Sequence, residues 1–174
     1  FSDTPFLNEI RKENSSIISV TNYTFDIFVT ESIFSLSNGV KIILANDEEV
    51  EDPFLLTKLV EMKKPRVIQT TPSKMKYYLS ALESFKQYQS IELIILGGEP
   101  FSGELYLKLK EKTAATICNG YGPSETTVWI SSQEATQAQT SIGHPLSNNQ
   151  IYLMSNKKLV GIGMLGALFV AGKS

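Results

Sequence analysis

The hydrophobic pattern of the chain alternates between short apolar runs and longer amphipathic stretches. The apolar runs are bounded by polar, Gly or Pro residues, which is typical of β-strands. One run, IELIILGG, is almost unbroken, as expected of a strand buried on both faces of a sheet. The predicted strands cover residues 16–20, 40–45, 66–70, 91–98 and 114–119.

Between these strands, apolar residues recur at the spacing of amphipathic helices. One predicted helix presents an apolar face between Phe25 and Leu36, and Asn38-Gly39 supplies its left-handed stop. Asp52-Pro53 is a typical helix start, because Asp caps the first turn and Pro fits its first position. Two more predicted helices begin at Pro72 and at Ser102.

Strand and helix alternate four to five times over about 120 residues, which predicts an α/β fold with a mostly parallel, doubly wound sheet and flanking helices. The last part of the chain differs. VWISSQ, QIYLMS and GALFVAG read as short strands separated by Asn, Gly and Pro turns, typical of a meander or a barrel-like segment. We therefore predict an α/β part over residues 1–135 and a short β-rich segment of the same domain over residues 136–174.

Composition narrows the class of protein. The chain has 174 residues, 42% hydrophobic and 20% charged, with a net charge of −2, so it has no basic footprint for nucleic acid. No run approaches the ~18 apolar residues of a membrane span. The start, FSDTPFLNEI, resembles no signal peptide and lacks an initiator Met, which suggests a piece of a longer protein. A single cysteine fits a reducing compartment, and we expect a cytoplasmic protein.

In doubly wound sheets, ligands bind beyond the carboxyl ends of the strands. Four segments qualify here: the one after Val20, residues 69–71, residues 97–99 and the stretch NGYGPSETT. The paired glycines of IILGGEPF either form a tight strand-to-helix turn or let a ligand approach the backbone. Neither GxxxxGK[ST] nor GxGxxG occurs, so this is no phosphate loop of either kind.

NGYGPSETT has two interpretations. In one it is a turn, with Glu125 as a helix-start residue. In the other, the ring of Tyr121 forms a wall for a flat base, the hydroxyls of Ser124 and Thr126 donate to phosphate oxygens, and Glu125 holds Mg²⁺, a cation that prefers oxygen ligands. The residues alone favour neither.

Asp26 is the second acid of interest, because it lies in the apolar segment FDIF, on or beside a helical face expected to be buried. A buried carboxylate needs a partner. That partner is either the backbone N–H groups of a helix start or the ammonium group of a ligand.

Other polar and aromatic residues point to ordinary structure. His144 is the only histidine and has no partner at metal or triad spacing. Cys118 is expected to pack as a small hydrophobe, and Tyr77-Tyr78 to pack within a helix. Trp129 is a core residue by default. No Ser/His/Asp or Cys/His/Asp constellation can be built, which argues against nucleophilic hydrolysis.

NGYGPSETT resembles the NxYGPTE motif of amino-acid adenylation domains in nonribosomal peptide synthetases, members of the acyl-adenylate-forming superfamily. YTFDIFVTE resembles the segment with the substrate-binding aspartate, and LGGEPF the loop lining the adenine site. IGHPLSNNQIYLMS and VGIGMLGALFVAG resemble the later motifs IGxPIxNxxxYIxD and VGxxGELYIGG. The matches occur in family order across most of the chain.

The resemblance implies ATP-dependent activation of an amino acid as its adenylate, followed by transfer to a carrier-protein thiol. Tyr121 would stack on adenine, Ser124 would touch phosphate, and Glu125 would coordinate Mg²⁺. Asp26 would pair with the α-amino group. The implied nucleotide-binding residues are Gly98, Glu99, Pro100, Asn119, Gly120, Tyr121, Gly122 and Ser124.

The resemblance also implies a side-chain pocket in which Trp129 leaves little volume, as in glycine-activating domains; alanine or cysteine are alternatives. Its lining would be Ile27, Thr30, Gln69, Ile95, Gly97, Gly120, Val128 and Trp129. An aryl- or fatty-acid-activating relative is a further alternative, but such substrates have no ammonium group for Asp26.

Implied partners are a peptidyl carrier protein with its phosphopantetheine, neighbouring synthetase domains and an MbtH-like helper protein, in a ligase of antibiotic or other secondary metabolism. The family's phosphate loop would precede residue 1, and its ribose-binding segment and catalytic lysine would follow residue 174. We therefore expect the chain alone to be inactive. Ala167, in place of the glutamate of the GEL motif, leaves open a non-catalytic scaffold.

Overall fold

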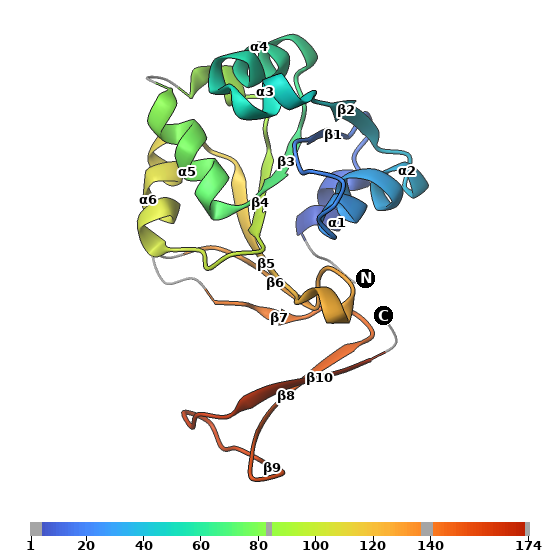
Figure 1. Cartoon of the computed structure of the whole chain (residues 1–174), viewed down its shortest axis with the longest axis vertical. Helices are drawn as coiled ribbons and strands as arrows, with labels where there is room; N and C mark the ends of the chain where they lie inside the picture. Colours follow the sequence, from blue (N-terminus) through green and yellow to red (C-terminus); the bar gives the residue numbers. More distant parts are fainter. Residues whose placement is uncertain (1–4, 83–84, 137–140, 173–174) are drawn as a thin grey trace.

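The computed structural model describes residues 5–82, 85–136 and 141–172. Its main element is a seven-stranded sheet with the strand order β2-β1-β3-β4-β5-β6-β7 (Figure 1). The first five strands in this order are parallel, β6 pairs with β5 in an antiparallel manner, and β7 pairs with β6 in the same manner. The strands are β1 (Ser16–Ser19), β2 (Lys41–Leu44), β3 (Val67–Thr70), β4 (Leu93–Gly97), β5 (Thr116–Tyr121), β6 (Ser131–Glu134) and β7 (His144–Pro145).

Helices connect the parallel strands and cover both faces of the sheet. The larger elements were all predicted from sequence, whereas α1, α3 and the short η2 were not. The helical elements are α1 (Pro5–Ile10), the π-helical η1 (Thr30–Phe34), α2 (Ser35–Ser37), α3 (Asp47–Glu51), α4 (Pro53–Lys63), α5 (Pro72–Ala81), α6 (Gly103–Lys112) and the 3₁₀ segments η2 (Lys86–Tyr88) and η3 (Ser124–Thr126).

The strand residues alternate between two hydrophobic cores, because successive side chains point to opposite faces. On one face, Ile68, Ile94 and Ile117 pack with helices α4, α5 and α6. On the other face, Val67 and Ile95 pack with α1 and with Phe34 of η1. The sheet is therefore the middle of three layers, and burial on both faces explains the unbroken apolar run of β4.

Three helices begin at side-chain caps, of which the sequence analysis named the cap at Asp52. Asp52 accepts hydrogen bonds from the backbone N–H groups of residues 54 and 55, and Pro53 occupies the first position of α4. Thr71 caps α5, and Ser102 caps α6. These caps satisfy backbone donors that a helix start would otherwise leave unpaired.

Strands β1, β3, β4 and β5 are consecutive neighbours and parallel. Their carboxyl ends therefore lie along one edge of the sheet. This confirms that the four segments selected from sequence end on a common edge: residues 20–21, 69–71, 97–99 and 119–127.

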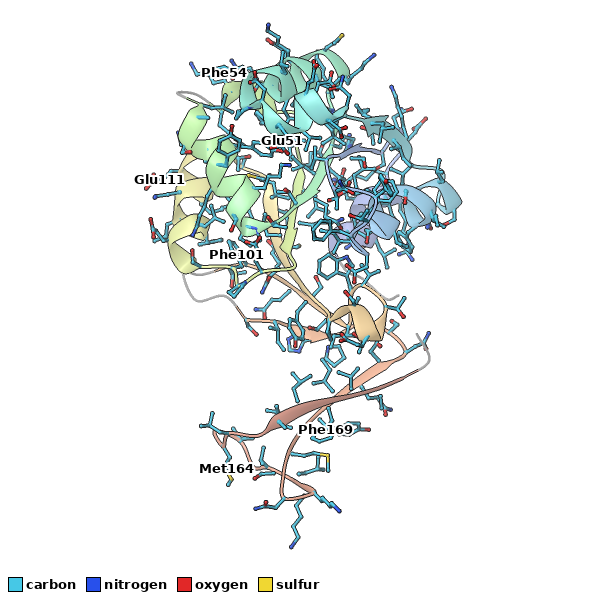
Figure 2. The ribbon with its side chains drawn as sticks, in the orientation of Figure 1. Glu51, Phe54, Phe101, Glu111, Met164 and Phe169 are labelled. Atoms are coloured by element: carbon cyan, nitrogen blue, oxygen red, sulfur yellow. The ribbon has the colours of Figure 1, made fainter. Side chains whose placement is uncertain are left out.

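The β-rich end of the chain forms a separate antiparallel sheet of three strands in the order β10-β8-β9, which extends away from the main sheet (Figure 1). Its strands are β8 (Asn149–Ser155), β9 (Lys158–Leu159) and β10 (Ala167–Gly172). Large apolar side chains are exposed on it, among them Met164 and Phe169 (Figure 2). Strands β8, β9 and β10 form this separate sheet, whereas β7, which also lies after residue 136, joins the main sheet together with β6, from VWISSQ.

The apolar face predicted between Phe25 and Leu36 is helical from residue 28 onward but is largely not buried. Phe25, Val29, Ile33 and Leu36 are all exposed, because no part of the described chain packs over them. Gly39, with φ of 72°, ends this segment in the left-handed conformation, as its sequence predicted. Within the described ranges no helix is long and apolar enough to cross a membrane.

We expect Asp52→Ala to lower the free energy of unfolding by about 1 kcal/mol, because it removes the N-cap of α4. Urea denaturation measures this change. Asp52→Asn is the matched control: an asparagine side chain can accept the same hydrogen bonds, so its stability should stay near wild type. Equal losses in both variants would contradict the capping role.

Candidate functional site

Four residues predicted to contact an amino acid share one face of the main sheet. Gln69 pairs with Ile95 across β3 and β4, and Gly97 pairs with Gly120 across β4 and β5. All four are buried. Because Ile95 and Gly97 lie two residues apart on one strand, they point to the same face, and the register places the other two beside them.

Trp129 covers the two glycines of this face. A Cβ atom added to Gly97 would lie 2.3 Å from the indole, and one added to Gly120 would lie 3.0 Å from it. The Trp129 Nε1–H also donates a hydrogen bond of 3.1 Å to Thr30 Oγ1. At Gly97 only glycine leaves room for the ring, and at Gly120 a Cβ atom would need the ring to shift, so the placement of Trp129 depends on these glycines.

An apolar cavity of about 200 Å³ lies beside Trp129. Five predicted residues line it, namely Thr30, Ile95, Gly120, Val128 and Trp129. Sequence analysis missed Phe6, Phe34 and Leu146 as lining residues. The helical spacing around Phe34 could have suggested its burial, whereas no motif marks the other two.

The loop that follows β5 is tightly folded. A Cβ atom on Gly122 would lie 2.1 Å from the carbonyl oxygen of Val128, so only glycine fits there. Thr127 and Val128 have φ angles of 63° and 66°. Left-handed backbone is rare for β-branched residues and costs about 1–3 kcal/mol each, and such strain clusters at binding sites.

The same loop presents its polar groups to solvent. Ser124 and Glu125 are exposed in η3, and Tyr121 is half-buried at the end of β5. In the described part of the chain, Glu125 has no ion-pair partner, and no cluster of three or more His, Cys, Asp or Glu side chains could hold a metal. Glu125 is therefore a single exposed carboxylate, which would hold Mg²⁺ only together with oxygen ligands from other groups.

The predicted loop after β4 lies on the same edge as Tyr121. Gly98 is left-handed, with φ of 78°, and residues 98–100 are exposed. The Glu99 carboxylate accepts hydrogen bonds from the backbone N–H and the hydroxyl of Ser73, in the first turn of α5. Asn119 is buried, and its Nδ2 donates a 2.7 Å hydrogen bond to the carbonyl oxygen of Ser141.

Asp26 is half-buried rather than enclosed, and no hydrogen bond or ion pair to its carboxylate occurs among the described residues. It lies in consecutive turns, in which the N–H groups of residues 28, 29 and 30 donate to the carbonyls of residues 25, 26 and 27. Ile27 and Thr30, predicted with it, are buried. The carboxylate is thus available to a ligand cation.

Sequence analysis missed Glu31, which is completely buried next to Thr30. Its carboxylate accepts hydrogen bonds from Ser19 and Thr21 at the end of β1 and from Gln69 of β3. The sequence pattern gave no sign of this burial, because a glutamate within a helical stretch usually faces solvent.

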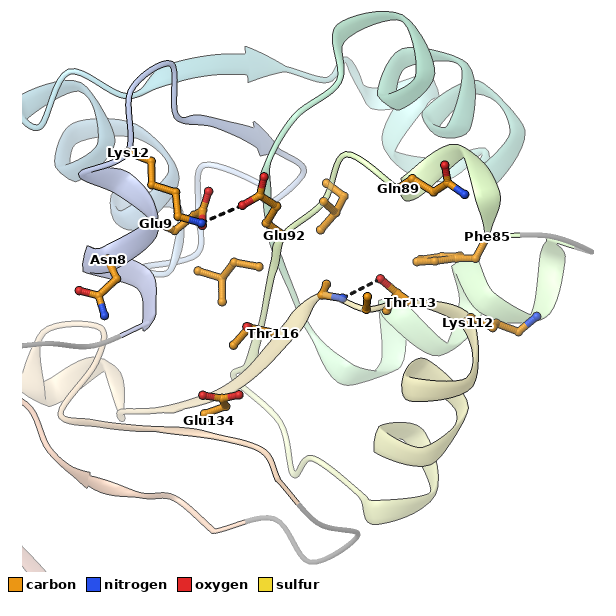
Figure 3. Close-up of a pocket in the computed structure, with 14 residues that line it drawn as sticks. Asn8, Glu9, Lys12, Phe85, Gln89, Glu92, Lys112, Thr113, Thr116 and Glu134 are labelled. Atoms are coloured by element: carbon orange, nitrogen blue, oxygen red, sulfur yellow. Dashed lines mark hydrogen bonds and ion pairs between the residues drawn. The ribbon is translucent and has the colours of Figure 1, made fainter.

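A second cavity, of about 680 Å³, lies at the opposite edge of the sheet, beside the first residues of β4 and β5 (Figure 3). None of the predicted site residues lines it. There Lys12 and Arg66 both form ion pairs with Glu9 and Glu92, at 2.5–2.8 Å. These pairs join α1 to the starts of β3 and β4, and they hold the pKa of Glu92 below its usual value.

Cys118 is buried, as predicted for a small hydrophobe, and it also lines the apolar cavity. Burial, with a smaller contribution from the charge of Glu134, raises the pKa of its thiol to about 12. His144 is exposed in β7. Neither residue contributes a nucleophile to the carboxyl edge.

The parallel sheet, the glycine-rich loops at its carboxyl edge and the half-buried Tyr121 are the features of a nucleotide-binding α/β domain. The chain belongs to the AMP-binding enzyme family, whose model matches residues 4–174. Its relatives are nonribosomal peptide synthetases, and it corresponds to part of their adenylation domain.

Among these relatives, the chain is 27% identical over 164 residues to a dimodular nonribosomal peptide synthase of Bacillus subtilis (strain 168), covering 92% of this chain and 7% of that protein. It is 30% identical over 160 residues to gramicidin S synthase 2 of Aneurinibacillus migulanus, covering 90% of this chain and 4% of that protein. The chain therefore spans only a small part of each synthetase.

Among solved structures, the four-domain synthetase holo-AB3403, bound to AMP and glycine, matches with a TM-score of 0.83 and 31% identity, over 91% of this chain and 12% of that one. The N-terminal subdomain of Klebsiella oxytoca NpsA, in complex with 3-hydroxybenzoyl-AMSN, matches with a TM-score of 0.79 over 93% of this chain and 43% of that one. At 17% identity, the second match shows the fold alone.

We expect Gly97→Ala to displace the Trp129 indole, because the new Cβ would lie 2.3 Å from the ring. The Cβ cannot move away toward the backbone, since the carbonyl oxygen of Gly120 is 2.6 Å from it on that side. Overpacking of this kind costs about 1–3 kcal/mol of stability. Since Trp129 is the only tryptophan, its fluorescence should shift as well.

Gly161→Ala is the control for this substitution, since the nearest atom to its new Cβ is 3.5 Å away. It should leave both the unfolding midpoint and the emission spectrum unchanged. A Gly97→Ala variant with wild-type emission would show that the indole does not occupy this space.

We expect Cys118 to react with a thiol reagent at pH 8 at least about a thousandfold more slowly in the folded chain than in urea, because its raised pKa leaves little reactive thiolate. Absorbance of the released reporter group measures both rates. Equal rates in the two states would contradict the burial of this side chain.

Proposed function

We propose that this chain contributes the amino-acid pocket, and part of the adenylate site, of an adenylation domain that activates a small amino acid such as glycine. The product is an aminoacyl-AMP, which is then transferred to the phosphopantetheine thiol of a peptidyl carrier protein. The placement of Trp129 over Gly97 and Gly120 carries this proposal. With the indole in that space, the pocket suits a substrate without a large side chain.

The match to a synthetase bound to AMP and glycine supports this choice, because that structure shares 31% identity with the chain. Its pocket accommodates the smallest amino acid. In the present chain, Ile27, Thr30, Gln69, Ile95 and Val128 complete the proposed lining around the indole.

Asp26 is the proposed partner of the substrate α-ammonium group. Its carboxylate is half-buried, follows the carboxyl end of β1 and forms no ion pair with the described residues. An ammonium group would provide the missing opposite charge in a partly desolvated place, where such a pair is stronger than in water. Aryl and fatty acids would leave the carboxylate unpaired.

The nucleotide residues lie on the same edge. Tyr121 offers a half-buried ring for adenine, and the exposed loop from Gly98 to Pro100 would border the base. The Ser124 hydroxyl faces solvent, where it could donate a hydrogen bond to a phosphate oxygen. Glu125 would hold Mg²⁺, which when bound neutralises charge on the phosphate oxygens. The chain's own part in the reaction is to orient the carboxylate of the amino acid toward the α-phosphate.

The exposed apolar side chains indicate further packing partners. Two groups of large apolar side chains are exposed, one between Tyr23 and Leu44 and one on β8–β10, and contiguous exposed apolar surface marks interaction sites. We propose that they pack against other parts of a larger adenylation domain, which would bring the remaining catalytic groups. An MbtH-like helper protein and neighbouring synthetase domains are further proposed partners.

The proposal predicts that the chain binds a stable sulfamoyl analogue of glycyl-AMP more tightly than the phenylalanyl analogue, since the larger side chain would collide with Trp129. Asp26→Asn should weaken binding of the glycyl analogue by about 10- to 100-fold, the loss expected for one charge-assisted hydrogen bond. Titration calorimetry, with Trp129 fluorescence as a second signal, measures these affinities.

Glu111→Gln is the matched control for this experiment, because it removes a carboxylate from the exposed end of α6, far from the carboxyl edge. It should bind like wild type. Preference for the phenylalanyl analogue would refute the small-substrate pocket.

A non-catalytic scaffold is the second candidate function. Ala167, at the start of β10, favours it, because the related motif has a glutamate there. A scaffold would bind neither analogue, and side chains would fill the space beside Tyr121 in a crystal soaked with ATP and Mg²⁺. Adenine ordered against Tyr121 would exclude this alternative.

A further inference from the structure

Glu31 is a buried carboxylate without a cation. It accepts five hydrogen bonds, and no ion pair reaches it from the described residues. Three donors are the Ser19 hydroxyl at 2.8 Å and the backbone N–H groups of Val20 and Thr21 at 3.0 and 3.1 Å. The other two donors are the Thr21 hydroxyl and the side-chain amide of Gln69, whose Nε2 lies 3.1 Å from Glu31 Oε1. Every donor belongs to the carboxyl end of β1 or to β3.

The Gln69 amide connects Glu31 to the backbone of the proposed pocket. Its Nε2 donates to Glu31 and also, at 2.8 Å, to the carbonyl oxygen of Ile27. Rotating the amide would bring its oxygen against two acceptors, so the orientation is fixed by its surroundings. Glu31 and Gln69 together tie the turn after Asp26 to the sheet.

The segment that carries Asp26 has little regular structure of its own. Residues 23–27 form turns, and residues 28–37 then form one short helix whose middle, η1, is π-helical. Such short pieces are not stable by themselves, and π-helical turns recur at functional sites. Contacts outside the segment must therefore fix its position.

The same segment reaches the indole of the pocket. Thr30, directly before Glu31, accepts the hydrogen bond of Trp129 Nε1 on its hydroxyl, and its carbonyl oxygen accepts one from the Ser35 hydroxyl at 2.7 Å. A displacement of Glu31 would thus move Thr30, whose hydroxyl is the hydrogen-bond partner of Trp129.

Stability alone does not explain a carboxylate at this place. Burying a charge is costly even when every oxygen is hydrogen-bonded, and apolar residues of similar volume often stabilise a core more. Burial also raises the pKa of Glu31, although its hydrogen bonds oppose the change. The carboxylate instead fixes the relative position of its neighbours, because its two oxygens accept five hydrogen bonds from separate segments.

We propose that Glu31 is a positioning residue: acting with Gln69, it holds the Asp26–Thr30 segment and the Trp129 indole in the geometry of the amino-acid pocket, without touching the substrate. This inference rests on the proposed function for the meaning of that geometry. The contacts themselves can be tested without any ligand.

The experiment measures Trp129 fluorescence in the 174-residue chain without ligand. Glu31→Gln keeps the size of the side chain but replaces one acceptor oxygen with a donor that opposes the Gln69 amide. We expect emission at longer wavelength and stronger quenching by acrylamide than in wild type, at a temperature where both chains are folded.

Glu9→Gln is the matched control, because Glu9 is also a buried carboxylate but lies at the opposite edge of the sheet, in ion pairs with Lys12 and Arg66. It should lower the unfolding midpoint while leaving the emission and the quenching unchanged. A spectral change in Glu9→Gln as large as in Glu31→Gln would overturn the proposal, since general loosening would then explain both.

Wild-type emission and quenching in a folded Glu31→Gln variant would also overturn it. If that variant does not fold, Gln69→Met decides, because it removes the amide contacts to Glu31 and Ile27 and keeps most of the volume. A spectral shift in Gln69→Met supports the positioning role, and an unchanged spectrum refutes it.

Binding of the glycyl-AMP analogue separates this inference from the proposed function. If Glu31→Gln changes the Trp129 spectrum but the wild-type chain binds no analogue, the proposed substrate is wrong and the positioning of Trp129 by Glu31 still holds. If the wild type and a spectrally unchanged Glu31→Gln variant both bind the analogue normally, the proposed substrate holds and the positioning role of Glu31 is wrong.

Discussion

The parallel pairing of β1, β3, β4 and β5, buried on both faces, is the constraint on which the rest of the structure depends. Parallel neighbours require crossover connections, so each strand is followed by a loop at the same edge of the sheet. Segments separated by as many as a hundred residues consequently meet there. A chain with antiparallel pairing at its centre would have divided these loops between two edges.

The sheet also determines the shape of the pocket. The register aligns Gly97 with Gly120, which leaves a shallow depression between two buried strands, and the Trp129 indole fills it. The pocket is therefore limited by backbone from below and by one aromatic ring from above. On its remaining side, the segment after β1 is irregular and depends on the Glu31 hydrogen bonds for its position.

Most of the fold could be predicted from sequence, because its strands are continuous apolar runs and its main helices have capping residues. The short helices α1 and α3 escaped prediction, since fewer than two turns give no clear period. The apolar face between Phe25 and Leu36 was predicted correctly as helical from residue 28 onward and wrongly as buried. Periodicity shows that a face suits burial, but not whether this chain supplies the cover.

The positions of Tyr121 and Glu125 on the carboxyl edge could be predicted, because they follow from strand order, whereas their contacts with adenine and Mg²⁺ stay predictions. The buried position of Glu31 could not be predicted, because it results from contacts with residues 12 positions earlier and 38 positions later. Likewise, the dependence of Gly97 on Trp129 is a packing relation between distant segments, which no local pattern encodes.

The four-membered ion-pair group of Glu9, Lys12, Arg66 and Glu92 closes the amino edge of the sheet, away from every proposed binding residue. Anchoring contacts and recognition loops thus occupy opposite edges of the same strands. In such an arrangement, loops at the carboxyl edge can change during evolution while the anchoring edge is retained.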